Sequence, residues 1–285
     1  MTKRVITGVV YALIVLAGIY YDGWVMTALL SISMFVATFE MIRALKRRDM
    51  KPIAPIGYLF CALTTLTQVL QTKGANGFQL SILSLVICTM IACAHLVLRG
   101  KIATDELMAT LFPMVYPGMF FVLLMGCVRL GSRPESMLAL GAAFFSSSIN
   151  DMMALFTGMA FGKHKLSPQI SPKKTIEGSI GGLLFCVLFT LFLPEINGFV
   201  LGLFNAELAA SMYNLYPRWF YALLGLMVGI ASQIGDLTAS MVKRHCGLKD
   251  YGKILPGHGG IMDRMDGVLF SGAVCYIFFR MAGLG

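Results

Sequence analysis

Long apolar stretches recur along almost the whole chain, and they limit its fold more than any other feature. A helix needs about 20 mostly apolar residues to cross a bilayer. Of the 285 residues, 57% are hydrophobic and only 13% are charged, whereas about 25% are charged in an ordinary soluble domain. The sequence therefore predicts an all-α, polytopic integral membrane helix bundle. About nine transmembrane helices are expected, at Val5–Tyr21, Trp24–Leu45, Ala54–Gln71, Phe78–Leu98, Leu107–Val128, Ser136–Phe156, Ile176–Leu193, Trp219–Val242 and Gly267–Met281.

Basic residues are distributed unevenly between the connections. If the N-terminus is cytosolic and the spans alternate, most of the 23 Lys and Arg lie on the cytosolic side, notably around Lys46–Lys51, Lys163–Lys174 and Lys243–Arg264. This agrees with the preference of basic loops for the cytosolic side. We therefore expect a multi-pass protein of the cell's inner or plasma membrane with a cytosolic N-terminus. The net charge of +9 then reflects topology and anionic lipid headgroups, so no nucleic acid partner is expected.

The two halves of the chain differ in their polar content. Residues 1–135 form N-terminal membrane helices with few polar groups inside the spans. Residues 136–285 carry amides and carboxylates at membrane depth, together with two polar cytosolic segments. We therefore predict that 136–285 is the catalytic part, with active-site loops on the cytosolic side.

One predicted helix presents a row of polar side chains. Gln233, Asp236, Ser240 and Lys243 are separated by three, four and three residues, so they share one helix face. An ionisable residue within a membrane span is costly and indicates function. The alternative is that Asp236 is merely neutralised by Lys243 or Arg244 at the membrane edge.

Two further carboxylates follow a glycine-rich turn. The turn is Pro256–Gly260, whose glycines allow the backbone to approach a ligand closely. Asp263 and Asp266 come directly after it and share a helix face. Together with Asp236 they are predicted to hold a hard cation such as Mg²⁺, which prefers carboxylate and phosphate oxygens.

The segment Ser171–Thr175 carries a third polar cluster. Ser171 is a suitable N-cap and Pro172 a suitable first helical residue, which would place Lys173 and Lys174 in the first turn. Cations oppose the helix dipole there unless an anion binds, so the segment predicts a phosphate cradle at a helix start. The alternative is that these lysines only contact lipid phosphates.

Polar residues elsewhere have simpler interpretations. Glu40, near the cytosolic end of a span, is predicted to pair with Arg43 or Lys46. The seven cysteines include no CxxC pair and mostly lie in apolar runs, so they are interpreted as small buried side chains.

These motifs resemble a known family. Ser240-x-x-Lys243-Arg244, then Lys249-Asp250, then Pro256–Gly260 with Asp263-Arg264-x-Asp266 is similar to the signature of the phosphatidate cytidylyltransferase (CDP-diacylglycerol synthase) family. Asp151 with Ala154 and Gly158, followed by Gly162–Leu166 and Ser171–Gly178, also resembles it. The resemblance is specific over about residues 150–267 and departs from the family pattern at Met152, Leu155 and Ile176.

The resemblance implies a reaction between CTP and phosphatidate that gives CDP-diacylglycerol and pyrophosphate. It implies Mg²⁺, and a second cation, K⁺ or Mg²⁺, is also conceivable. The partners are then the two substrates and membrane lipids, with a homodimer left open. Catalytic roles are expected for Asp236, Lys243, Arg244, Asp263 and Asp266, of which Asp236, Asp263 and Asp266 are the expected metal ligands. Substrate-binding roles are expected for Asn150, Asp151, Ser171, Lys173, Lys174, Thr175, Ser240, Lys249, Asp250, His258, Gly259, Gly260 and Arg264.

Two other functions are compatible with part of this pattern. A CTP-dependent lipid kinase, such as a polyprenol kinase, would transfer the γ-phosphoryl group and release CDP. A cation-coupled transporter could use Asp151 and Asp236, but the polar residues gather at one face of the membrane and no internal repeat is visible.

Overall fold

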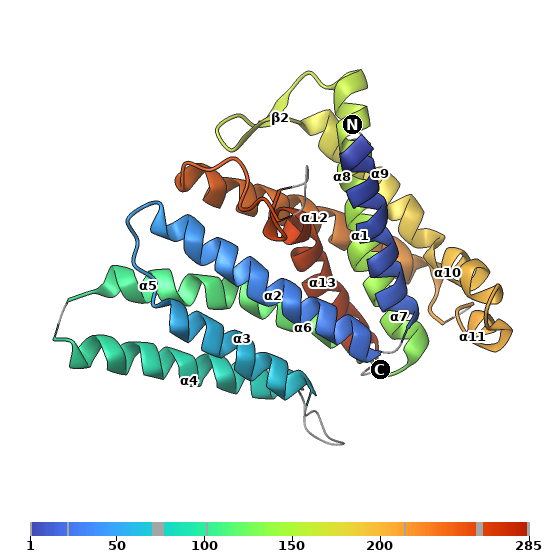
Figure 1. Ribbon diagram of the computed structural model, residues 1–285. Helices are drawn as coiled ribbons and strands as arrows, with labels where there is room; N and C mark the ends of the chain where they lie inside the picture. The colour runs from blue at the N-terminus through green and yellow to red at the C-terminus, as the bar shows by residue number, and fades with distance from the viewer. Residues whose placement is uncertain are drawn as a thin grey trace. The chain divides into compact units, whose positions relative to one another are not determined.

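The computed structural model describes residues 2–21, 23–69, 77–100, 102–213, 215–254 and 259–283. Most of these residues are helical, and their one sheet has two strands (Figure 1). Among them, six helices are long and apolar enough to cross a membrane, or seven if the bent pair α9 (Ile176–Leu191) and α10 (Leu193–Gly202) is one span. The predicted helical membrane architecture is confirmed. The count of about nine spans and the cytosolic N-terminus stay predictions.

The chain forms two compact units, and neither is a continuous stretch of sequence. The first consists of Met1–Gly126 and Val242–Met265, and the second of Cys127–Met241 and Asp266–Gly285. The boundary falls inside two long helices, α12 (Arg218–His245) and α13 (Met262–Ala282). The predicted division at 135/136 separates regions by function rather than by packing, and it stays a prediction.

The first unit is built around hydrophobic helices of the N-terminal part of the chain. Helices α3 and α4 lie side by side, and α2 packs against α3 (Figure 1). The helical path is interrupted near Pro113 and Pro117, where Tyr116 has non-helical dihedral angles (φ −128°, ψ 112°) between two helical segments. The elements are α1 (Thr2–Tyr20), α2 (Gly23–Lys46), α3 (Ala54–Val69), α4 (Gly77–Leu98), α5 (Thr104–Pro113), the π-helical turn η1 (Met114–Met119) and most of α6 (Phe120–Cys127).

The second unit contains a closely packed helix pair, α8 and α9 (Figure 1). Glycines on α9 make this approach possible, because a methyl group at Gly178 would lie 2.6 Å from the Ala154 carbonyl oxygen and one at Gly182 would lie 2.7 Å from that of Asn150. Small residues at such an interface are typical of membrane helices. The other elements are α7 (Arg133–Gly141), the π-helical turn η2 (Ala142–Ser146), α8 (Ser147–Phe161), β1 (Lys165–Ser167), β2 (Ser171–Thr175), α10 and α11 (Ala206–Ala210).

The segment between α8 and α9 corrects one prediction. Ser171 was expected to cap a helix that contained Lys173 and Lys174, but Ser171–Thr175 is strand β2, paired antiparallel with β1. The helix begins at Ile176, and Thr175 is its N-cap, with Oγ1 accepting from Gly178 N at 3.1 Å. The expected helix start was wrong because pairing with β1 satisfies the backbone groups that a cap would otherwise satisfy.

Candidate active site

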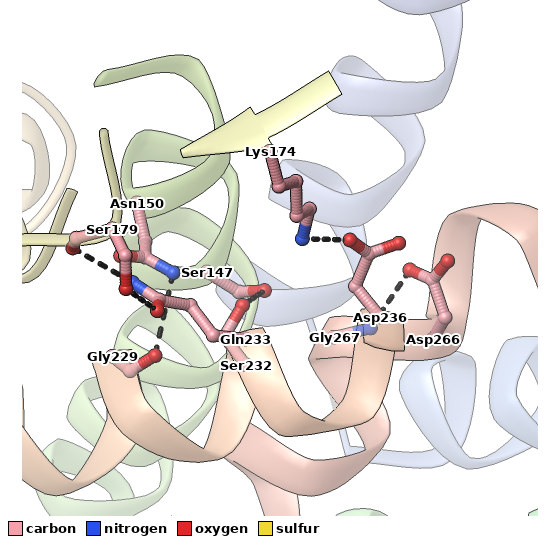
Figure 2. Close-up of polar contacts among 10 residues, drawn as sticks. All are labelled: Ser147, Asn150, Lys174, Ser179, Gly229, Ser232, Gln233, Asp236, Asp266 and Gly267. Atoms are coloured by element: carbon pink, nitrogen blue, oxygen red, sulfur yellow. Dashed lines mark hydrogen bonds and ion pairs between the residues drawn. The ribbon is translucent and has the colours of Figure 1, made fainter. Parts of the chain in front are cut away.

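In the second unit, an ion pair joins the polar segment Ser171–Thr175 to the polar face of α12. Lys174 Nζ on β2 contacts Asp236 Oδ2 on α12 (Figure 2). The two side chains keep 28% and 21% of their surface exposed, so the pair is neither fully buried nor free in solvent. The alternative partners for Asp236, Lys243 and Arg244, are wrong. They lie seven and eight residues further along the same helix, about 10–12 Å away along its axis.

A second carboxylate of this unit lies beside Asp236. Asp266, 8% exposed, is on α13, and its Oδ1 accepts from Gly267 N at 2.8 Å (Figure 2). The close approach of the two helices requires glycine, because a methyl group at Gly235 would overlap the Asp266 carbonyl oxygen. A methyl group at Gly267 would likewise lie 2.7 Å from Ser232 Oγ. Glycines next to Asp236 and Asp266 thus let the two helices approach closely enough to bring these carboxylates together.

A buried amide network lies along α12 on the same unit. Gln233 Nε2 donates to Asn150 Oδ1 at 3.1 Å, and Asn150 Nδ2 donates to the Gly229 carbonyl at 3.3 Å (Figure 2). Ser179 Oγ donates to Gln233 Oε1. These bonds satisfy the polar groups of a fully buried Asn150 and fix α8, α9 and α12 with respect to one another.

The β1–β2 hairpin is held to the start of α9 by one carboxylate. Glu177 Oε1 lies 2.6 Å from His164 Nδ1, and Glu177 Oε2 accepts from Lys163 N at 3.0 Å. Thr175 Oγ1 lies close to Gly158 of α8, because a methyl group at Gly158 would be 2.8 Å from it. The strand that carries Lys174 is therefore anchored at its end.

In the first unit, Asp263 has a partner on both carboxylate oxygens. Lys243 Nζ contacts Oδ1 at 2.8 Å, with only 11% and 5% of the two side chains exposed. Tyr251 N and Gly260 N both donate to Oδ2, at 2.8 and 2.9 Å. Asp263 thus fixes the backbone at Tyr251 and Gly260, two positions of the α12–α13 connection, to the last turn of α12.

Helix α12 ends shortly before a glycine. Gly247 has φ +66°, a conformation that glycine adopts without strain. Gly247 N donates to the Arg244 carbonyl at 3.1 Å, and Leu248 N donates to that of Lys243 at 2.8 Å. This six-to-one and five-to-two pattern is the Schellman ending of a helix.

Comparison with known proteins identifies the family. The model of the Cytidylyltransferase family matches residues 2–282. The chain belongs to this family. A phosphatidate cytidylyltransferase of Bacillus subtilis is 29% identical over 283 residues, covering 99% of this chain and 98% of that protein. One from Staphylococcus saprophyticus is 30% identical, covering 95% of each chain. The chloroplastic phosphatidate cytidylyltransferase 4 of Arabidopsis thaliana is 30% identical, covering 98% of this chain and 73% of that protein.

The other predicted site residues of this cytidylyltransferase-family chain differ in exposure. Ser171 is half-buried, and Ser240 and Gly260 are buried. Gly259 has φ +85°, which favours glycine. His258 lies outside the described residues. The exposed members of the set are Asp151, Lys173, Arg244, Lys249, Asp250 and Arg264.

Sequence reasoning missed three partners. Lys174 binds the carboxylate of Asp236, and Thr175 rather than Ser171 caps α9. Glu40, expected to pair with Arg43 or Lys46, interacts with the charge of Arg43 and also accepts a hydrogen bond from Met262 N at 2.9 Å. Of these contacts, only the Thr175 cap could have been predicted from the neighbouring sequence, because a threonine three residues before Gly178 can cap a helix. The other two contacts join distant parts of the chain.

Proposed function

We propose that this chain transfers the cytidylyl group of CTP to phosphatidate, giving CDP-diacylglycerol and pyrophosphate within a membrane. Membership of the Cytidylyltransferase family over residues 2–282 supports this, as do full-length relatives named phosphatidate cytidylyltransferase. The observation that carries the proposal is the ion pair between Lys174 and Asp236. It brings a cation from β2 and a carboxylate from α12 together, two elements that are far apart in the sequence.

The reaction needs charge control rather than a strong base. A phosphate monoester oxygen of phosphatidate attacks the α-phosphorus of CTP and forms a new P–O bond. The bond from the α-phosphorus to the bridging oxygen breaks, and its electron pair leaves with pyrophosphate. The nucleophile is already ionised near neutral pH. Because both reactants are anionic, cationic groups must screen them, and we assign Lys173 and Lys174 to their phosphates.

Mg²⁺ fits the carboxylates of the second unit. Asp236 and Asp266 present oxygen ligands of the kind that Mg²⁺ prefers. Among the described residues, no group of three His, Cys, Asp or Glu side chains could hold a metal ion. When bound, Mg²⁺ would neutralise phosphate charge. Asp263 as a ligand, and K⁺ or a second Mg²⁺, stay predictions.

The orientation follows from the substrate and from the basic residues. CTP is cytosolic, and the basic segments around Lys163–Lys174 and Lys243–Arg264 are expected on that side. We therefore place the active site at the cytosolic face of the cell's inner or plasma membrane. A homodimer stays a hypothesis.

Position-specific label tests the reaction. The purified protein is given phosphatidate in detergent micelles with CTP labelled either at the α- or at the γ-phosphorus, with and without Mg²⁺. We expect α-label in lipid and γ-label in pyrophosphate, and both only with Mg²⁺. The γ-label in lipid together with released CDP would instead indicate a kinase. Label in lipid from neither position would refute the proposal.

A further inference from the structure

Helix α2 of the first unit carries a carboxylate in an unusual place. Glu40 is 0% exposed, on a helix that is apolar enough to span a membrane. A buried carboxylate is costly unless hydrogen bonds or opposite charges compensate it. Glu40 Oε2 accepts from Met262 N at 2.9 Å, and Met262 is the first residue of α13. The negative charge thus lies at the positive end of a helix, where it is stabilised.

The second oxygen of Glu40 points at two glycines. Glu40 Oε1 has no hydrogen-bond partner among the described residues. A methyl group at Gly252 or at Gly260 would overlap this oxygen. Gly252 and Gly260 also touch each other, because a methyl group at Gly252 would lie 2.9 Å from Gly260 Cα. We call these two glycines the loop base, since the chain between them begins and ends there.

One turn further along α2, Arg43 holds the same segment. Its Nη2 donates to the Tyr251 carbonyl at 2.6 Å. Tyr251 N donates to Asp263, so both polar groups of this backbone position are taken, one by α2 and one by α13. The Tyr251 ring also lies 5.5 Å from Lys243 Nζ. The two side chains of α2 therefore contact the residues that surround the Lys243–Asp263 ion pair.

We infer that Glu40 and Arg43 are positioning residues of the enzyme: they fix the loop base and thereby the orientation of Lys243 and Asp263. This inference rests on the proposed function and on the catalytic roles that the family resemblance implies for Lys243 and Asp263. It also gives the N-terminal helices a part in the reaction, although none of their residues belongs to the predicted site. Local charge pairing within α2 would not explain why both side chains reach the α12–α13 connection.

Glu40→Gln is the main test, because it keeps the size of the side chain and removes its charge. Amide hydrogen exchange of residues 251–262 is measured in the folded, purified protein, together with kcat and KM for CTP. We expect faster exchange in this segment. We also expect kcat to fall about 10- to 100-fold, the effect of losing one charge-assisted hydrogen bond, with KM changed by less than about threefold. Glu40→Asp, which keeps the charge, should recover part of kcat.

Two further variants distinguish a specific effect of Glu40 from a general loss of folding. Thr38→Val alters another fully buried polar residue of α2, which contacts Cys61 on α3, and it should change neither exchange at 251–262 nor kcat. Arg43→Met removes the contact with Tyr251 from an exposed position, so it tests the loop base even if Glu40→Gln does not fold.

The outcomes distinguish a failure of the positioning role of Glu40 and Arg43 from a failure of the proposed function. Unchanged exchange at 251–262 in Glu40→Gln and Arg43→Met would overturn the inference. So would faster exchange with an unchanged kcat. If the unmodified protein makes no labelled lipid, the proposed function fails instead. In that case faster exchange would still support the role of Glu40 and Arg43 in fixing the loop.

Discussion

Removing the charges of Lys174 and Asp236, singly and then together, distinguishes a functional ion pair from a structural one. Lys174→Met and Asp236→Asn each leave one charge without its partner. Breaking a fully buried pair in this way costs about 3–5 kcal/mol, and an exposed pair contributes about 0–1 kcal/mol. With 28% and 21% of the side chains exposed, we expect each single variant to lose about 2 kcal/mol of stability. The double variant should regain most of that loss, because neither charge is left unpaired.

Activity should not follow stability in this series. If Asp236 and Lys174 act on phosphates or metal, all three variants lose at least about 100-fold in cytidylyl transfer, including the stable double variant. The assay is lipid-linked α-label from CTP at fixed Mg²⁺, with thermal unfolding in the same detergent. Lys51→Met, an exposed lysine outside the site, controls for the loss of one positive charge. A double variant that regains both stability and turnover would show that the pair only neutralises itself, and our reasoning would be refuted.

Three further results are expected. Gly235→Ala should abolish activity or folding, because the added methyl group overlaps the Asp266 carbonyl oxygen. Gly100→Ala is the control: Gly100 has φ +62° and no atom near the new methyl group, so the variant should lose only about 1 kcal/mol of stability and keep its turnover. Thr175→Val should lower the unfolding free energy by about 1 kcal/mol through loss of the α9 cap, while Thr175→Ser should stay near the unmodified value; equal stability of all three would contradict the assigned cap. Cysteines placed at Lys163 and Lys249, both exposed, should react with impermeant reagents only from the cytosolic side, and labelling from outside intact cells would contradict the topology.

The helices were the most predictable part of the fold. The predicted span Phe78–Leu98 and helix α4 (Gly77–Leu98) differ by one residue, and Trp24–Leu45 and α2 (Gly23–Lys46) by one at each end. Such agreement has a physical cause, because a bilayer requires both the length and the apolar composition of a spanning helix. The positions where the chain leaves the apolar stretches were predicted less well.

The site was predictable in its residue types but not in its pairings. Helical spacing placed Gln233 and Asp236 on one face, and the structure shows both in polar contacts of the second unit. The partner of Asp236 could not be derived, because Lys174 comes from a strand that local capping rules had interpreted as a helix start. Pairing between β1 and β2 is decided by backbone groups of two segments together, and a rule that considers one segment does not include it.

The contact between Glu40 and Met262 has a consequence for biosynthesis. The two residues are 222 positions apart, so the ribosome makes the carboxylate long before its partner. At about 5–20 residues per second, Glu40 waits about 10–45 s for the start of α13. During that interval α2 carries a carboxylate that lacks its stabilising helix end. The nascent N-terminal helices therefore cannot complete the surroundings of Glu40 until the first residue of α13 has been made.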